Sequence, residues 1–150
     1  MPTAATTTPA ADDGVHKLGQ RVSKTDPTVN GTVFRYRQPV AESAPRPDEQ
    51  PRYEWGAADV RVCATKDANP KNYITNSSWT LVYADDTVIE PSSTGYQQFP
   101  LPEYPWGEEP LVPGRCVRGW ITYPVPKGKR PVFVQWSPGE EPVPPRWAVK

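Results

Sequence analysis

Proline is the residue type that most restricts how this chain can fold. The sequence contains 21 prolines among 150 residues, and they recur along its length. Proline has no backbone N–H and its ring clashes with the preceding turn of a helix, so long helices are disfavoured where prolines are this frequent. Six tryptophans and seven tyrosines supply large apolar faces from few residues, which suits a small sheet core. We therefore expect an all-β fold.

Short runs of alternating apolar and polar residues lie between the prolines and are typical of β-strands. Asn30-Gly31 gives the strongest hairpin signal, because both residues tolerate positive φ. Asp85-Asp86 predicts a second turn. The pattern indicates an antiparallel sandwich or barrel of about seven to nine short strands. Strands are expected in residues 32–37, 58–65, 73–75, 78–84, 87–90, 116–123, 131–136 and 146–149.

The two cysteines, Cys63 and Cys116, each lie within a predicted strand. They have neither CxxC spacing nor histidines nearby, which argues against a zinc or redox site. We interpret them as a structural disulfide, which indicates an oxidising compartment; the alternative is a pair of buried free thiols. Alternation places both cysteines on the strand face that carries Arg61, Arg118 and Trp120. The disulfide should therefore join neighbouring strands on the outer side of one sheet.

Residues 111–128 read LVPGRCVRGWITYPVPKG. They resemble the L-x-P-G … G-W-[apolar]-x-[aromatic]-x-V-P-K-G segment of a family of extracellular lipoproteins from Gram-positive, chiefly actinobacterial, bacteria, whose domain has no known function. The fold of that family is similar to that of the immunoglobulin-like secreted immunogenic antigens of mycobacteria. Residues 18–22 and 79–86 match two further motifs of the family in the same order. The resemblance implies an immunoglobulin-like β-sandwich outside the cell, and it carries over no catalytic residues.

The N-terminal region predicts a leader rather than part of the sandwich. Residues 1–14 are mainly Thr, Ala, Pro and Asp without an apolar period, so we expect a disordered leader before an Ig-like domain over residues 15–150. No membrane span and no export signal are visible, so the chain is either cytosolic or has lost its signal; the predicted disulfide favours the second. Many members of the similar family are tethered by a lipidated N-terminal cysteine, which is missing here. We expect an extracellular or envelope-anchored protein.

The charged residues favour neither catalysis nor a nucleic-acid ligand. Seventeen Lys and Arg balance 17 Asp and Glu, whereas nucleic acid and anionic membranes attract an excess of positive charge. His16 is the only histidine, and the adjacent acids at 108–109 and 140–141 cannot flank a substrate as paired glycosidase carboxylates do. The acids within residues 85–90 lack the spacing of a calcium loop. We expect no catalytic residues, no metal site and no cofactor.

The segment with the most functional promise is the proline-rich stretch 96–107, whose rings are Tyr96, Phe99, Tyr104 and Trp106. Long connections without structure of their own are often functional, and rigid aromatic side chains lose little entropy on binding. The rings either present a surface to a protein or glycan partner, or fold back as a lid over the open end of the sandwich. A lid is favoured for most of them, because a large exposed apolar patch would promote aggregation. The prediction is a non-catalytic binding module, with a passive spacer domain as the alternative.

Overall fold

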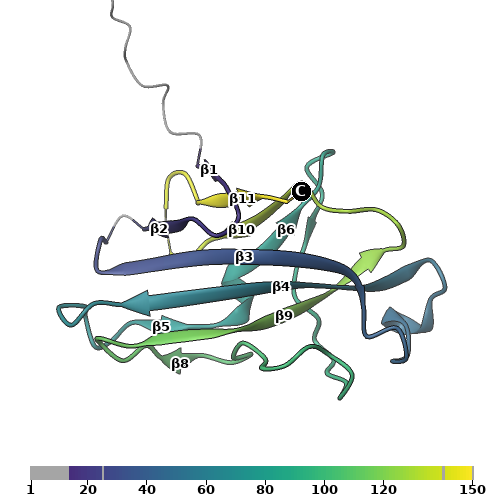
Figure 1. Ribbon diagram of the computed structural model, residues 1–150, viewed down its shortest axis with the longest axis horizontal. Helices are drawn as coiled ribbons and strands as arrows, with labels where there is room; N and C mark the ends of the chain where they lie inside the picture. Colours follow the sequence, from purple (N-terminus) through teal and green to yellow (C-terminus); the bar gives the residue numbers. More distant parts are fainter. Residues whose placement is uncertain (1–13, 25, 140, 150) are drawn as a thin grey trace, which may run out of the picture.

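Two β-sheets pack face to face in the computed structural model, which describes residues 14–24, 26–139 and 141–149 (Figure 1). One sheet has the strand order β1-β11-β10-β6-β7 and the other β2-β3-β4-β9, while β5 and β8 form a separate pair. All strand pairs are antiparallel except β1 and β11. The predicted all-β, Ig-like sandwich is confirmed. The predicted leader lies outside the described residues except for Gly14.

The strands differ widely in length. The four-stranded sheet consists of β2 (Arg21–Ser23), β3 (Val29–Val40), β4 (Tyr53–Ala64) and β9 (Cys116–Pro126). The five-stranded sheet consists of β1 (Val15–His16), β11 (Arg146–Ala148), β10 (Phe133–Trp136), β6 (Trp79–Val82) and β7 (Val88–Ile89). The small pair is β5 (Tyr73–Ile74) and β8 (Glu109–Pro110), and two short 3-10 turns are η2 (Pro47–Glu49) and η3 (Asn76–Ser78). β3, β4 and β9 have 11 or 12 residues each, so they are longer than the short strands expected.

Three tryptophans from the five-stranded sheet form the centre of the core. Trp79 stacks on Trp136 with ring centroids 5.4 Å apart, and Trp147 lies 5.8 Å from Trp79 on a tilted plane. All three side chains are buried. The facing sheet covers them with small and branched inward residues of β3, β4 and β9, namely Val33, Ala58, Val60, Val62 and Ile121. Together with Tyr36 and Tyr123 of the same sheet, these smaller side chains fill the space between the layers.

The predicted hairpin turn at Asn30-Gly31 is wrong. These residues lie inside β3, and the chain reverses earlier, where the Asp26 carboxylate accepts hydrogen bonds from the backbone N–H (3.0 Å) and hydroxyl (2.6 Å) of Thr28. Glycine is required at position 31 for packing, because a Cβ there would lie 2.9 Å from the ring of Trp136. Glycine is favoured both in a tight turn and where an aromatic ring lies close to the backbone, so the sequence alone does not show which of the two applies.

A β-bulge in β3 decides which side chains reach the outer face of the four-stranded sheet. The register between β3 and β4 shifts between Val33 and Arg35, which leaves Phe34 as the extra residue. Val33 and Tyr36 are buried between the sheets, three positions apart instead of two or four. Phe34, Arg35 and Arg37 consequently share the outer face.

The predicted disulfide is confirmed in position and geometry. Cys63 and Cys116 stand directly opposite each other in the register of β4 and β9, with a Cα–Cα distance of 4.0 Å, and their sulfurs are bonded. The flanking Val62 is buried in the core, so the cysteines lie on the outer side of the sheet. The bond ties two adjacent strands together rather than passing through the core.

Candidate functional site

The four aromatic side chains of the 96–107 loop, which the sequence offered as candidate binding residues, occupy different environments. Phe99 and Tyr104 are 2% and 1% exposed, Tyr96 is half-buried, and Trp106 remains 39% exposed. A buried ring cannot contact a partner, so the binding interpretation is corrected for Phe99 and Tyr104. Both rings fold back onto the protein as the lid interpretation expected, but Phe99 covers the outer face of one sheet rather than the open end of the sandwich. Trp106 stays available at the surface.

Phe99 closes one end of the outer face of the β2-β3-β4-β9 sheet. Its ring lies 4.8 Å from that of Trp55, an outward residue of β4, and Tyr96 packs edge-on against both at 5.6 and 6.0 Å. The Trp55 Nε1–H donates to the carbonyl of Pro45 at 2.8 Å. Val40, Ala41 and Ala44 complete this small apolar cluster. The lid therefore covers an end of the outer sheet face, and the middle of that face is left uncovered.

Tyr104 enters the core around the edge of β9. Its backbone N–H donates to the carbonyl of Trp120 at 2.9 Å, and the Trp120 N–H donates to the carbonyl of Pro102 at 2.8 Å. The Tyr104 ring then meets Trp79 edge-on, with centroids 6.3 Å apart, and burial raises the pKa of its phenol. Residues 102–104 thus extend the sheet by a short backbone pairing beside Trp120.

The uncovered part of the outer face carries five arginines, which we term the arginine face. Alternation along β2 and β9, and the bulge in β3, direct them outward. They are half of the ten arginines of the chain. Their positions are Arg21 on β2, Arg35 and Arg37 on β3, Arg61 on β4 and Arg118 on β9.

One buried carboxylate organises two of these arginines. Asp59, 4% exposed, accepts hydrogen bonds from Arg118 Nε at 3.1 Å and Nη2 at 2.9 Å, and lies 3.5 Å from Arg35 Nε. Hydrogen bonding to Asp59 raises the pKa of Arg118. Asp59 is the one acidic residue among the outward positions of the four described strands; Glu103 pairs with Trp120 at the edge of the face. The outward positions of β2, β3, β4 and β9 therefore carry five guanidinium groups and one carboxylate.

Two aromatic rings interleave with the arginines. The guanidinium carbons of Arg35 and Arg37 lie 5.8 and 5.6 Å from the centre of the Trp120 ring. Those of Arg61 and Arg118 lie 5.1 and 3.8 Å from the Phe34 ring. These cation–π contacts restrict the long side chains. Between them is a groove of about 410 Å³, lined by Arg35, Arg37, Asp59, Pro102, Arg118, Gly119 and Trp120.

The arrangement suits the binding of anions. A guanidinium offers planar pairs of N–H donors that match carboxylate, sulfate and phosphate oxygens. The acid on the face is already hydrogen-bonded, so the outward N–H groups of the arginines are directed to solvent or to a partner. Arginine and tryptophan are also the residue types that most often dominate the free energy of protein interfaces.

Sequence reasoning placed three residues of this face correctly but did not single them out as a candidate site. Alternation assigned Arg61, Arg118 and Trp120 to the face that holds the disulfide. Alternation did not assign Arg35 and Arg37 to the same face. The bulge interrupts the alternation of β3, and the pairing of β3 with β4 joins residues that are far apart in the sequence. The balanced total charge concealed the cluster as well, since a sum over the chain says nothing about how charge is distributed.

The acidic residues and the histidine considered for catalysis lie apart. Asp85 caps the turn between β6 and β7 by accepting from the Thr87 N–H at 3.0 Å, which confirms that turn. Glu108 and Glu109 are exposed, and Glu109 begins β8. The ring of His16 lies 5.9 Å from that of Trp147. In residues 14–24, 26–139 and 141–149, no three His, Cys, Asp or Glu side chains come together as metal ligands.

Fold and outer face define an immunoglobulin-like β-sandwich with a cationic, aromatic sheet face. Two solved structures share this fold. The secreted protein MPT63 of Mycobacterium tuberculosis matches with a TM-score of 0.59 and 18% identity over 89% of this chain and 95% of its own. The yjhA protein of Bacillus subtilis matches with a TM-score of 0.63 and 13% identity over 90% of this chain and 99% of its own. No protein-family model and no curated protein matches the sequence.

The part of the chain that the structure describes contains no helix with the length and apolar character needed to cross a membrane.

Proposed function

We propose that this protein is a non-catalytic extracellular module that binds an anionic protein or glycan through the arginine face. The observation that carries the proposal is the concentration of five of ten arginines, with Trp120 between two of them, on one sheet face of a chain whose net charge is zero. The outward positions of these strands carry five arginines and one acid, so the face has a local excess of positive charge although the chain as a whole is neutral. The partner carries clustered carboxylates or sulfates, whose oxygens match the paired N–H donors of a guanidinium.

An extracellular or envelope-anchored location is supported by two observations. The Cys63–Cys116 bond is of a kind that persists in oxidising compartments and is rare in the cytosol of most organisms. One structural neighbour, MPT63, is a secreted protein. Anchoring through an N-terminal lipid, as in the family that residues 111–128 resemble, is part of the same proposal.

A binding role without catalysis fits the chemistry of the face. Arginine remains protonated at physiological pH, so it donates hydrogen bonds but does not act as a general base. Asp59 is hydrogen-bonded to Arg118 and is directed away from solvent. The face therefore offers fixed positive charge and donors, and its side chains are positioned by Asp59 and by the two rings before a partner arrives, which reduces the entropy lost on binding.

The second candidate is a passive spacer domain, and one observation favours it. Phe99 and Tyr104 are buried, so half of the aromatic residues in the 96–107 loop serve the fold. A spacer requires no particular side chains on its outer face. It would bind acidic ligands no better than another protein of equal net charge. The arginine face distinguishes the two candidates.

The proposal is tested by calorimetric titration of the wild-type protein with three probes: a heparin oligosaccharide, polygalacturonate and a glutamate-rich peptide. An Arg35→Gln/Arg37→Gln variant is compared with Arg52→Gln/Lys127→Gln, which removes the same charge at exposed positions off the face. We expect binding that weakens with added salt, a loss of about tenfold or more in affinity for the first variant, and little change for the control. The preferred probe separates a glycan from a protein partner. Equal losses in both variants, or no binding to any probe, would support the spacer.

A further inference from the structure

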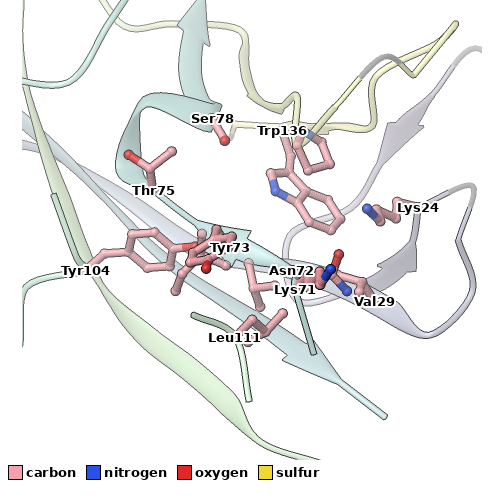
Figure 2. A pocket seen from close by; sticks show the side chains of 13 residues that line it. Lys24, Val29, Lys71, Asn72, Tyr73, Thr75, Ser78, Tyr104, Leu111 and Trp136 are labelled. Atoms are coloured by element: carbon pink, nitrogen blue, oxygen red, sulfur yellow. The ribbon is translucent and has the colours of Figure 1, made fainter. Parts of the chain in front are cut away.

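The free side of β3, the side away from β4, is paired along only half of its length. Val29, at the start of β3, and Trp136 line a pocket at the end of the sandwich (Figure 2). β2 then pairs with residues 30–32, and the Val33 carbonyl accepts from the Gly19 N–H at 2.7 Å. Beyond Val33, no described segment pairs with this side of β3 (Figure 1). We term this second half of the strand the open edge.

The hydrogen-bonding pattern of the sheet shows which backbone groups face the open edge. In an antiparallel sheet, the N–H and C=O of one residue point to the same side of the strand, and those of the next residue point to the other side. Trp120 directs both of its groups away from β4, to the 102–104 segment. Its partner Asp59 therefore directs its own groups to Arg35 of β3. The N–H and C=O of Tyr36 consequently point out from the open edge, where no described residue binds them.

The side chains on either side of Tyr36 make the open edge selective for charge. Arg35 and Arg37 are exposed on the outer face, and a strand added to this edge would place one of its side chains directly opposite each of them. A second copy of β3, paired antiparallel about Tyr36, would place arginine against arginine, which is destabilising. Acidic residues at these two positions would form cross-strand ion pairs instead. The charge of the edge thus disfavours a dimer and favours an acidic strand.

Two further charged groups lie near the open edge. The Arg130 guanidinium carbon lies 5.3 Å from the centre of the Tyr36 ring. The Glu54 carboxylate accepts from the Gln38 Nε2 at 2.7 Å and from the Gly128 N–H at 3.0 Å, so its charge is already engaged by donors. The open edge therefore keeps an excess of positive charge.

The irregularities of β3 limit how much of an added strand can pair. The bulge at Phe34 precedes Tyr36, and a second register shift follows between Arg37 and Val40. Pro39 has no N–H to donate. Such interruptions prevent the edge of a sheet from extending by long strand pairing. The open edge therefore suits a short segment of about five residues.

We infer that the open edge binds a short extended protein segment in which two acidic residues flank a third residue. The acids lie opposite Arg35 and Arg37, and the residue between them exchanges two backbone hydrogen bonds with Tyr36. Strand addition of this kind is a common mode of peptide recognition. The inference rests on the proposed function, since it uses two members of the arginine face. It selects a protein as the partner, because a glycan has no backbone that can extend the sheet.

The first test removes single backbone donors from a peptide. The parent is acetyl-Val-Glu-Val-Glu-Val amide, whose central valine pairs with Tyr36, and binding is measured by calorimetric titration. N-methylation of this valine removes the N–H that donates to the Tyr36 carbonyl and should weaken binding by about tenfold. N-methylation of a glutamate is the matched control, because its N–H points away from β3, and should leave the affinity nearly unchanged. Equal losses from the two methylations would overturn the inference.

The second test changes the spacing of the acids and observes the protein directly. Acetyl-Val-Val-Glu-Glu-Val amide has the same composition and charge, but its adjacent glutamates point to opposite faces of an extended chain. It should bind about fivefold more weakly than the parent. The parent peptide should also slow hydrogen exchange at the Tyr36 N–H, measured by NMR. Equal affinity of the two isomers, or an unprotected Tyr36 N–H in the complex, would contradict strand addition.

A heparin oligosaccharide separates this inference from the proposed function, because it carries anions without a peptide backbone. We expect Arg35→Gln/Arg37→Gln to weaken the parent peptide by about tenfold, and the Arg52→Gln/Lys127→Gln control to change it little. If heparin and every peptide bind through the arginines, with no effect of methylation or spacing, the strand inference fails and the arginine face remains an anion site. If no acidic probe binds, both proposals fail.

Discussion

The carboxylate of Asp59 accepts two hydrogen bonds from the guanidinium of Arg118, on the neighbouring strand, at 3.1 and 2.9 Å. The same carboxylate lies 3.5 Å from Arg35 on the strand at its other side. One acid on the central strand β4 thus holds arginines of β3 and β9 in place. Because Asp59 is buried while both arginines are half exposed, the pairing leaves positive charge at the surface and the compensating charge beneath it.

Replacement of Asp59 by asparagine tests this arrangement. Asp59→Asn removes a charge-assisted pair and should lower the free energy of unfolding by about 1–3 kcal/mol, measured by urea denaturation. The variant also loses the carboxylate that positions Arg35 and Arg118, so its affinity for a heparin oligosaccharide should fall although the face gains a net positive charge. An affinity that stays equal or rises in the folded variant would show that Asp59 neutralises the arginines more than it positions them.

The disulfide should contribute strongly to stability. Closing a loop with a sequence separation of 53 residues stabilises the folded state by ~4 kcal/mol in the chain-entropy model. Cys63→Ser/Cys116→Ser should therefore melt well below the wild type under oxidising conditions, and at the temperature of the wild type treated with reductant. Equal melting of the wild type with and without reductant would contradict this contribution.

Gly119 permits the loop to reach the core, and a single methyl group should disturb it. A Cβ at this position would lie 2.6 Å from the backbone carbonyl carbon of Glu103 and 2.7 Å from the Cα of Tyr104. Gly119→Ala should therefore destabilise the protein by about 2 kcal/mol and expose Tyr104. Gly107→Ala, where a Cβ meets no atom within 4 Å, is the control; equal stability of the two variants would refute the close packing.

Stability should fall at alkaline pH because of buried tyrosines. Burial raises the pKa of Tyr36, Tyr104 and Tyr123, and raises that of Tyr83 to about 12. A phenol is neutral when protonated, and in the unfolded chain it loses its proton near pH 10. The unfolded state therefore releases protons first, and the free energy of unfolding declines as the pH rises from about 10 toward 12.

Urea midpoints measured from about pH 9 upward would detect this decline. A Tyr83→Phe variant removes one of the four phenols, so its stability should depend less steeply on pH in this range. Identical slopes for the variant and the wild type would show that Tyr83 ionises as readily in the folded state as in the unfolded state.

The strands and the disulfide could be predicted from the sequence because both depend on local alternation. In residues 58–65 and 116–123 every second residue is apolar, and the structure keeps that alternation through β4 and β9 without a register shift. The prediction of an outer, cross-strand disulfide followed directly. Asn30-Gly31 failed because the packing of Trp136 against Gly31 is a contact between distant segments.

The arginine face could be predicted only in part. The arginines of β4 and β9 follow from alternation. Those of β3 depend on a bulge at Phe34, and no glycine, proline or other turn residue beside it indicates that bulge in the sequence. The division of the loop rings into buried Tyr104 and exposed Trp106 likewise depends on how the backbone of residues 102–104 pairs with Trp120. Such long-range pairings are fixed by the whole fold, not by the residues that form them.

The most direct measurement of the central claim is an NMR titration of isotope-labelled protein with an acidic ligand, observed at the side-chain N–H signals of tryptophan and arginine. If the outer sheet face binds anions, the Trp120 indole signal and the Nε–H signals of Arg35, Arg37 and Arg118 will shift together and saturate, while the exposed Trp106 stays unchanged. Shifts centred on Trp106, or small shifts spread evenly over all arginines, would contradict a binding site at this face.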